Sequence, residues 1–396
     1  MTQPRSRLVC LDDTPWYHVV SRCVRRAFLC GYDAQSGCSF EHRRGWIADR
    51  LKQLASVFSV DIAAYAVMSN HFHIVLRVDA TRLQHASRNE VLHRWTRLFN
   101  GPLLVQRYLA DPGSLGDAEL RALDTWVETY RDRLADLSWF MRVLNESIAR
   151  QANEEDGVTG RFWEGRFRSQ ALLDEQAVLT AMTYVDLNPI RAGLAPTPES
   201  SDYTSIAERI AALNEHAEGA PQVPVVTEPQ GGQAMGATSI GTAHGAGHND
   251  SDDLERSPRL MESFKGQNTE RRENPRLHHE RVLQKLPSAP LMPFDGTGRF
   301  EQAIAFAFED YLALVDATGR AIREGKRGFI DGAAPPLLDR LGIEPEQFIT
   351  TASRMLRQFG SAIGTPSHIS DLCVTRQMRY LRGMGAARKL YAKSAA

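Results

Sequence analysis

Two short β-rich segments, residues 59–68 and 71–78, follow one another with only a Ser-Asn pair between them. They read SVDIAAYAVM and HFHIVLRV, and a two-residue link between such runs is typical of a tight β-hairpin. The hairpin commits this part of the chain to an antiparallel sheet. Because side chains alternate between the faces of a strand, we expect His71 and His73 on one face and Phe72 on the other.

The rest of the N-terminal half alternates between strand-like and helix-like segments. A β-rich run covers residues 14–22, and residues 158–173 are expected to form a strand or an extended arm. Helix-spaced apolar residues recur in four segments: 40–58, 88–99, 137–155 and 175–187. We interpret the acidic segment 101–136 as a less regular insertion. This order predicts an α+β fold in which helices pack against an antiparallel sheet.

A change of composition divides the chain. Between about residues 215 and 290 it is rich in Gly, Pro, Ser and Asn, as in PQGGQAMGATSIGTAHGAGHNDSDD, and has too few apolar residues to form a core. We therefore predict an N-terminal domain over residues 1–212, a flexible linker over 213–290 and a helical accessory domain over 291–396. Helices are predicted in this last segment over residues 299–315, 322–327, 335–341, 344–359 and 369–391. The last predicted helix, 369–391, is basic, which is compatible with DNA binding.

Charge and cysteine content narrow the possible functions. The 47 Lys and Arg residues nearly balance the 48 Asp and Glu residues, so net charge argues against indiscriminate binding to nucleic acid. The chain nevertheless has local clusters of basic residues, each of which either contacts phosphates or is an ordinary solvated surface. The candidate DNA contacts in these clusters are Arg161, Arg166, Arg168, Arg376 and Arg379. Five cysteines without a CxxC pair indicate reduced thiols rather than a zinc site.

Neither a membrane span nor a signal peptide is expected. No apolar run approaches the ~20 residues that cross a bilayer, and the first seven residues, MTQPRSR, lack an apolar stretch. We therefore expect a cytoplasmic protein with no membrane partner, associated with the nucleoid if it binds DNA.

The two histidines of the hairpin allow two interpretations. Two imidazoles spaced two apart on a strand can bind one divalent metal ion, which would act as a Lewis acid on a phosphoryl oxygen. Alternatively, His71 and His73 are core residues, each satisfied by a local hydrogen bond. The HxH pattern alone favours the second interpretation.

A second pair of residues favours the metal site. Tyr184 and Asn188 lie four apart at the end of the helix predicted over residues 175–187 and so share a face, and Pro189 is expected to end that helix. A tyrosine hydroxyl can act as a covalent nucleophile, and an asparagine oxygen can supply a third metal ligand. Taken alone, Tyr184 would more often be a packing aromatic.

Three motifs in this order, MSNHFHIVL, GRFWEGRFRSQAL and YVDLNPIRAGL, resemble the single-tyrosine HUH transposases, in particular the REP-associated tyrosine transposases. The resemblance covers residues 15–210 and implies a ferredoxin-like, RRM-related HUH domain. It implies that His71, His73 and Asn188 hold Mg²⁺ or Mn²⁺. It further implies that Tyr184 cleaves and rejoins single-stranded DNA, at hairpin or repeat ends, through a 5′-phosphotyrosine during DNA transposition.

Several alternatives stay open. The same chemistry would serve a domesticated, repeat-processing nuclease, and an RRM-like module would bind nucleic acid without cleaving it. In the motif GRFWEGRFRSQAL of the predicted arm, the arm motif, basic residues would contact the DNA backbone. Its aromatic residues Phe162, Trp163 and Phe167 would either stack on unpaired bases or pack in the core. A homodimer is also open, so Tyr184 would act either in cis or in trans.

Overall fold

The computed structural model describes residues 8–24, 29–33, 37–219, 280–323 and 336–392. The described residues up to 217 and from 280 onward belong to the first of two units into which the chain divides. Most of the predicted linker, 213–290, lies outside the described residues. The fold below is that of the first unit.

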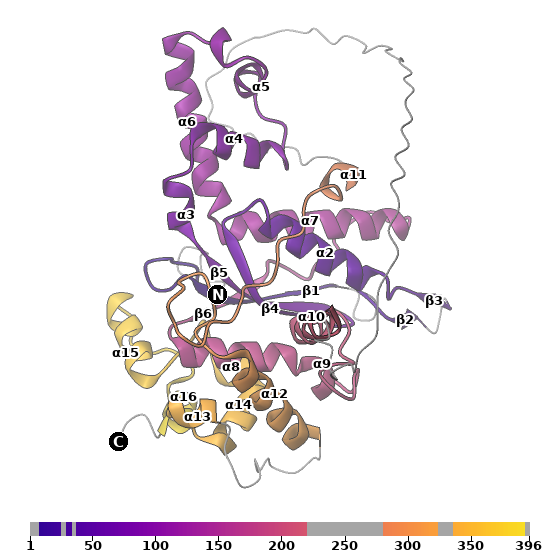
Figure 1. The fold of residues 1–396 in the computed structure, drawn as a ribbon, viewed down its shortest axis with the longest axis vertical. Helices are drawn as coiled ribbons and strands as arrows, with labels where there is room; N and C mark the ends of the chain where they lie inside the picture. The colour runs from indigo at the N-terminus through magenta and orange to yellow at the C-terminus, as the bar shows by residue number, and fades with distance from the viewer. Residues whose placement is uncertain (1–7, 25–28, 34–36, 220–279, 324–335, 393–396) are drawn as a thin grey trace, which may run out of the picture. The chain divides into compact units, whose positions relative to one another are not determined.

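A five-stranded sheet forms the centre of this unit, in the order β4 (Val60–Val67), β5 (His71–Val78), β1 (Trp16–Arg22), β6 (Arg168–Leu172) and β7 (Ala362–Ile363) (Figure 1). Strands β4, β5, β1 and β6 pair antiparallel, whereas β7 pairs parallel to β6. The predicted hairpin of β4 and β5 is confirmed. A separate pair, β2 (Tyr32–Asp33) and β3 (Cys38–Ser39), forms a small two-stranded sheet.

Helices cover both faces of the large sheet. Helices α2 (Arg43–Ala55) and α7 (Leu137–Glu155) lie on one face, and α8 (Glu175–Asp186) lies on the other (Figure 1). Two contacts hold α7 against the sheet. Asn145 Nδ2 donates to Ser21 Oγ on β1 at 3.0 Å. Trp163, whose indole N–H donates to the Asn145 carbonyl, packs edge-on against Phe72 on β5 at 5.6 Å between ring centroids. The coarse prediction of helices packed against an antiparallel sheet is therefore confirmed, with β7 as a parallel addition.

Local signals begin and end the helix that matters most for the site. The Asp174 carboxylate accepts a hydrogen bond from the Ala177 N–H at 2.8 Å and caps the start of α8. The helix ends at Asp186, and the short helix α9 (Asn188–Arg191) follows almost directly, with Pro189 in its first turn. Tyr184 and Asn188 thus lie on successive helices, and both are buried.

The segment predicted to be irregular, residues 101–136, is helical, so that prediction is wrong. Helices α3 (Ala80–Gln84) and α4 (Arg88–Thr96) precede it, and it holds α5 (Leu103–Ala110), a 3₁₀ turn (Pro112–Ser114) and α6 (Asp117–Leu134). Its many acidic residues obscure an apolar stripe that packs inward and consists of Leu123, Val127, Tyr130 and Leu134. Trp95 of α4 stacks on Tyr130 at 4.5 Å between ring centroids.

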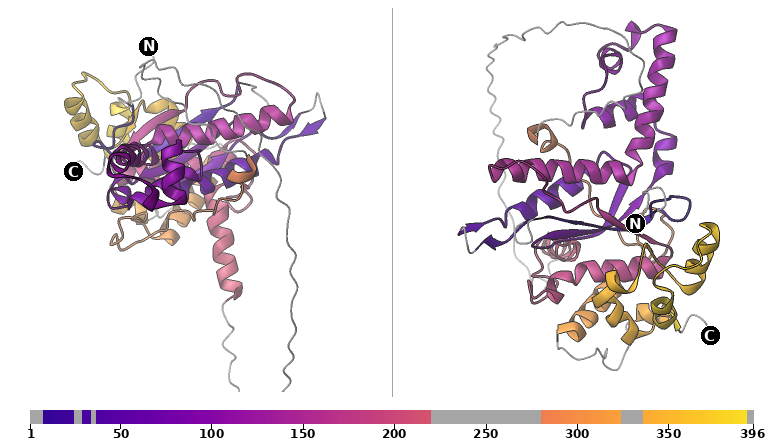
Figure 2. Two further views of the ribbon diagram at one scale, coloured as in Figure 1. Left: turned by 90° about the horizontal axis from the view of Figure 1, so that it is seen from above. Right: turned by 180° about the vertical axis from the view of Figure 1, so that it is seen from behind.

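Five helices in the described part of the C-terminal segment lie around the α8 face (Figure 2). They are α12 (Phe308–Arg323), α13 (Pro336–Arg340), α14 (Pro345–Gln358), α15 (Pro366–Thr375) and α16 (Met384–Leu390). The short helix α11 (Glu280–Leu283) lies near α2 instead, where Gln53 Nε2 donates to the Gln284 carbonyl (Figure 1). Helix α10 (Ser205–Gly219) ends the N-terminal part. Helix α14 packs against α8, and β7 joins the large sheet. The segments 1–212 and 291–396 therefore share a sheet and a compact unit, and their division into two domains stays a prediction about function.

Two predicted helix boundaries in this segment are wrong. The helix predicted from residue 299 begins only at Phe308, because the Asp295 carboxylate accepts backbone N–H bonds from Thr297, Arg299 and Phe300 and holds a loop there. The single basic helix predicted over 369–391 is two helices, α15 and α16. Gly383 stands before α16 with a φ of +123°, which favours glycine and does not continue a helix.

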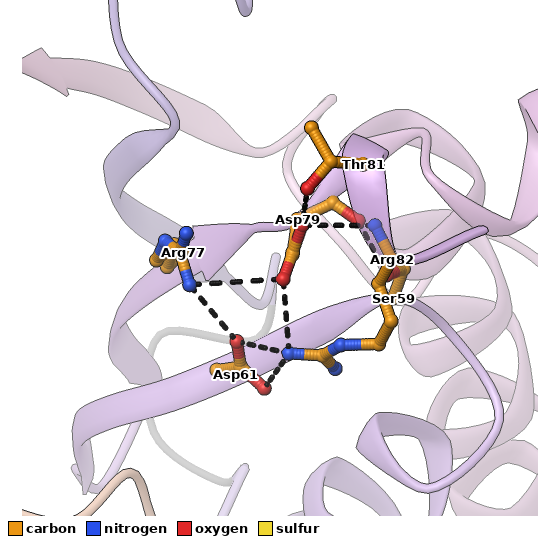
Figure 3. A network of polar contacts seen from close by, with 6 residues as sticks. All are labelled: Ser59, Asp61, Arg77, Asp79, Thr81 and Arg82. Atoms are coloured by element: carbon orange, nitrogen blue, oxygen red, sulfur yellow. Dashed lines mark hydrogen bonds and ion pairs between the residues drawn. The ribbon is translucent and has the colours of Figure 1, made fainter. Parts of the chain in front are cut away.

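A network of charges ties together the end of β5, the start of β4 and helix α3 (Figure 3). Arg82 donates to both Asp61 oxygens at 2.8 and 2.6 Å, while the Asp79 carboxylate caps α3 by accepting from the Arg82 N–H at 3.1 Å. Arg77 lies 3.9 Å from Asp61 and 3.7 Å from Asp79. Within the described residues, no helix is long and apolar enough to cross a membrane.

Candidate metal and nucleophile site

The first half of the site lies on β5. His71 and His73 share a face of this strand, as predicted, and their ring centroids are 4.9 Å apart. His73 is fully buried, whereas His71 is half-buried. On β1, Val20 pairs with His73 and Arg22 with His71, so the exposed Arg22 lies at the rim of the site.

The second half comes from α8 and α9, more than a hundred residues later. The Tyr184 ring packs edge-on against His73, with 5.4 Å between ring centroids, and is only 4% exposed. The Arg191 guanidinium lies 5.4 Å from the centre of the Tyr184 ring and donates to Asn188 Oδ1 at 2.7 Å. The structure thus brings His71, His73, Tyr184 and Asn188 into one cluster.

The imidazole of His73 tests whether a metal ion would fit this cluster. Its buried Nε2 has no hydrogen-bond partner among the described residues. The same holds for Asn188 Nδ2, but this amide nitrogen only donates hydrogen bonds and would face an oxygen rather than a metal ion. His71 Nδ1 lies 2.6 Å from Asn70 Oδ1, which leaves its Nε2 as the lone-pair atom. The two imidazoles therefore fit a metal ion, and Asn188 fits as a third ligand through the Oδ1 lone pair that Arg191 does not use.

The wider ligand set is limited. In the parts of the chain that the structure describes, no group of three or more His, Cys, Asp and Glu side chains is arranged to hold a metal ion. A site here would accordingly rest on two imidazoles, the Asn188 oxygen and oxygens of a substrate or water.

Burial sets the protonation of the cluster. It lowers the pKa of His71 to about 4, with the charges of Arg22 and Arg191 adding to the effect, and lowers the pKa of His73 well below its ordinary value. Both rings are therefore neutral at pH 7, as metal ligands must be. Burial raises the pKa of Tyr184, and the nearby Arg191 charge partly offsets this, so the side chain rests as a hydroxyl.

Two residues of the site were not found from the sequence, His18 and Gln170. His18 Nε2 lies 3.0 Å from His73 Nδ1, and the two rings are nearly coplanar, with 4° between their planes. His18 Nδ1 lies 3.0 Å from Gln170 Oε1 on β6. The only sequence signal was a histidine and a glutamine on predicted strands, and the pairing of those strands could not be read from the sequence.

The predicted DNA-contacting arginines lie in several places. Arg161, Arg166 and Arg168 are exposed, and Arg168 pairs with Val20 next to the histidine face. Arg161 donates to the carbonyl oxygens of Trp163 and Glu164. In the C-terminal segment, Arg379 is exposed, whereas Arg376 forms an ion pair with the partly buried Asp13, with 3.0 Å between Nε and the carboxylate.

The aromatic residues of the arm motif, GRFWEGRFRSQAL, pack in the core, so of the two alternatives left open for them, core packing is confirmed. Phe162 is 3% exposed, and Trp163 and Phe167 are 9% exposed. The Trp163 indole N–H donates to the Asn145 carbonyl at 2.8 Å, and its ring packs against Phe72. These rings therefore anchor the arm to α7 and β5.

Comparisons with known proteins give limited information. No family model matches the sequence, and no curated protein does. Among solved structures, the chain is similar to a REP-associated tyrosine transposase bound to a REP hairpin, with 12% identity over 50% of this chain and 79% of that one, at a TM-score of 0.30. This likeness is too weak to decide the function, which has to be argued from the residues.

Proposed function

We propose that this protein is a metal-dependent, single-tyrosine transposase or nuclease that cleaves and rejoins single-stranded DNA at hairpin or repeat ends. One observation carries the proposal: Tyr184 packs against His73 within a buried cluster that leaves His73 Nε2 without a partner among the described residues. A core histidine would be satisfied by protein hydrogen bonds, whereas the lone pair of His73 Nε2 is free to bind a metal ion.

The fold supports this assignment. The four antiparallel strands and the two helices on one face of the sheet follow the order βαββαβ along the chain, as β1, α2, β4, β5, α7 and β6. In the sheet these strands lie in the order β4-β5-β1-β6. We propose that this is the ferredoxin-like HUH domain, with residues 1–212 carrying the chemistry and residues 291–396 acting as an accessory segment.

In the proposed reaction, His71, His73 and Asn188 hold Mg²⁺ or Mn²⁺, which would polarise the scissile phosphate and stabilise the charge that develops on it. The phosphate enters beside the half-buried His71, where the exposed Arg22 and Arg191 neutralise its charge. Arg161, Arg166, Arg168 and Arg379 are proposed contacts along the DNA backbone. For Arg376 such a contact would compete with Asp13.

Tyr184 is the proposed nucleophile. Its oxygen forms a bond to phosphorus while the bond to the 3′ oxygen breaks; the tyrosine proton is lost, and the leaving oxygen takes up a proton to become a 3′-hydroxyl. The link formed is a 5′-phosphotyrosine, which another 3′-hydroxyl reverses, so no ATP is consumed. Since Tyr184 and His73 of one chain already meet, we propose that the tyrosine acts in cis.

The test uses labelled single-stranded hairpin DNA with Mn²⁺. Wild-type protein should form a covalent protein–DNA adduct that survives denaturation, and Tyr184→Phe should form none. Tyr65→Phe, a buried tyrosine of β4 whose hydroxyl donates to Glu208, is the matched control and should retain the adduct. If the adduct persists in Tyr184→Phe, the nucleophile is wrong. If binding occurs without any adduct, the non-catalytic RRM-like module is the better description.

A further inference from the structure

A chain of hydrogen bonds runs from the C-terminal segment to His73, and it begins at the backbone carbonyl of Gly360. Gln170 Nε2 donates to this carbonyl at 2.7 Å. A carbonyl oxygen only accepts hydrogen bonds, so the nitrogen of the Gln170 amide must face Gly360, and its oxygen must face His18.

The next link fixes the proton on His18. Gln170 Oε1 lies 3.0 Å from His18 Nδ1 and can only accept, so the proton of this neutral ring is on Nδ1. His18 Nε2 then carries a lone pair. The ring is fully buried, which keeps it neutral.

The last link fixes the proton on His73. His18 Nε2 lies 3.0 Å from His73 Nδ1, in nearly coplanar rings, so His73 must donate from Nδ1. The remaining nitrogen of His73, Nε2, is therefore the lone-pair atom. It is also the buried atom for which the described part of the chain provides no partner.

We propose that the Gly360 carbonyl, Gln170 and His18 act as a relay of positioning residues that holds His73 in the Nδ1–H tautomer, with its Nε2 lone pair directed into the metal site. This rests on the proposed metal-binding role of His73. It also gives residues 336–392 a part in the site, since Gly360 precedes β7, the strand that pairs with β6, which carries Gln170. Hydrogen-bond partners behind a ligating histidine fix its tautomer and raise its affinity for metal.

The tautomers can be read directly in the metal-free, full-length protein labelled with ¹⁵N-histidine. Long-range ¹H–¹⁵N spectra should show both His18 and His73 as Nδ1–H tautomers. Finding His73 as the Nε2–H tautomer would overturn the relay, whatever the activity of the protein. Conversely, the predicted tautomers without Mn²⁺ binding would support the relay and count against the proposed function.

A substitution tests the direction of the relay. Gln170→Leu removes the acceptor, so His18 should move its proton to Nε2 and donate to His73 Nδ1, which places the His73 proton on Nε2. Mn²⁺ affinity, measured by electron paramagnetic resonance, should then fall by about 10- to 100-fold. Ser169→Ala, on the other face of β6, should leave both tautomer and affinity unchanged. Unchanged tautomers and affinity in a folded Gln170→Leu protein would overturn the proposal.

Discussion

The two ends of strand β5 carry polar clusters of different kinds. At its C-terminal end, the Asp79 carboxylate faces Arg77 and Arg82 and caps α3, so each charge meets an opposite charge, although Arg77 Nη1 makes ion pairs there and no hydrogen bond among the described residues. At its N-terminal end, His73 lies in a buried, neutral cluster in which two polar atoms have no partner among the described residues. The first arrangement is what a stable fold requires. The second costs free energy unless a ligand completes it.

This difference between the two ends of β5 suggests that residues at one end contribute to stability and residues at the other to function. A buried donor or acceptor without a partner costs about 1–3 kcal/mol, so a site of this kind lowers the stability of the free protein. We therefore expect changes at the histidine end to affect chemistry and metal binding, and changes at the Asp79 end to affect folding. The following predictions test that separation, in order of expected effect.

The largest effect is expected for the nucleophile. Tyr184→Phe should reduce adduct formation by at least about a thousand-fold, because a residue that forms the covalent bond has no substitute. Its free energy of unfolding should stay within about 1 kcal/mol of wild type in urea titrations, since only a hydroxyl is removed. A loss of several kcal/mol would mean that Tyr184 belongs to the structural core rather than to the reaction.

The free energy of unfolding should depend on pH in different ranges for the histidine end and the Asp79 end of β5. Burial lowers the pKa of His18 to about 4 from an ordinary 6.5, so the unfolded state binds a proton before the folded state does. The free energy of unfolding in the metal-free protein is then complete above pH 6.5 and falls as the pH drops toward 4. A shift of this size corresponds to about 3 kcal/mol for one fully buried imidazole.

The Asp79 end should respond only at lower pH. Burial opposes ionisation of Asp79, but hydrogen bonds from Thr81 and the Arg82 N–H, with the charges of Arg77 and Arg82, outweigh it and lower its pKa. Its contribution is present above the ordinary pKa of 3.8 and is lost below it. Burial lowers the pKa of His71 to about 4 as well, so His71→Asn should reduce the slope between pH 6.5 and 4, and Asp79→Asn should not. The reverse pattern would contradict the assignment.

A bound metal ion should stabilise the protein only through the residues at the histidine end of β5. Mn²⁺ at about 100 times its Kd should raise the free energy of unfolding by about 2.7 kcal/mol if it binds only the folded state. His73→Ala should abolish this gain, and Asp79→Asn should keep it, as measured by the midpoint of thermal unfolding with and without metal. An equal gain in His73→Ala would place the metal elsewhere.

The smallest changes in stability are expected for substitutions of charged residues, at the Asp79 end of β5 and on the surface. Asp79→Ala removes the cap of α3 and the partner of two arginines, and should lower the free energy of unfolding by about 2 kcal/mol without changing Mn²⁺ affinity. Asp124→Ala breaks the exposed ion pair with Arg88 and should cost less than about 1 kcal/mol. Equal losses from the two substitutions would show that burial of the network contributes nothing.

Local patterns in the sequence were enough to predict part of the fold. Helix α7 has the bounds predicted, residues 137–155, because its apolar spacing and the Asp136 cap are both local signals. The hairpin of β4 and β5 likewise follows from alternation and a short turn. The shared face of His71 and His73 needed nothing more than the two-residue period of a strand.

The features that could not be predicted from the sequence depend on contacts between distant segments. His18 and Gln170 meet because β1 pairs with β6 in one particular register, which nothing local specifies. Burial of Phe162, Trp163 and Phe167 depends on where α7 and β5 lie, and the Gly360 carbonyl reaches the site only because β7 joins the sheet. In segment 101–136, an acidic composition obscured the apolar stripe of α6.

The central claim is that Tyr184 becomes covalently joined to DNA, and peptide mapping of the adduct tests it most directly. Trypsin should release residues 169–191, a peptide in which Tyr184 is the only tyrosine. After nuclease trimming of the DNA, mass spectrometry of the wild-type adduct should find a nucleotide phosphate on this peptide, at Tyr184. A nucleotide on any other residue, or its absence from this peptide when adduct is present, would contradict the account.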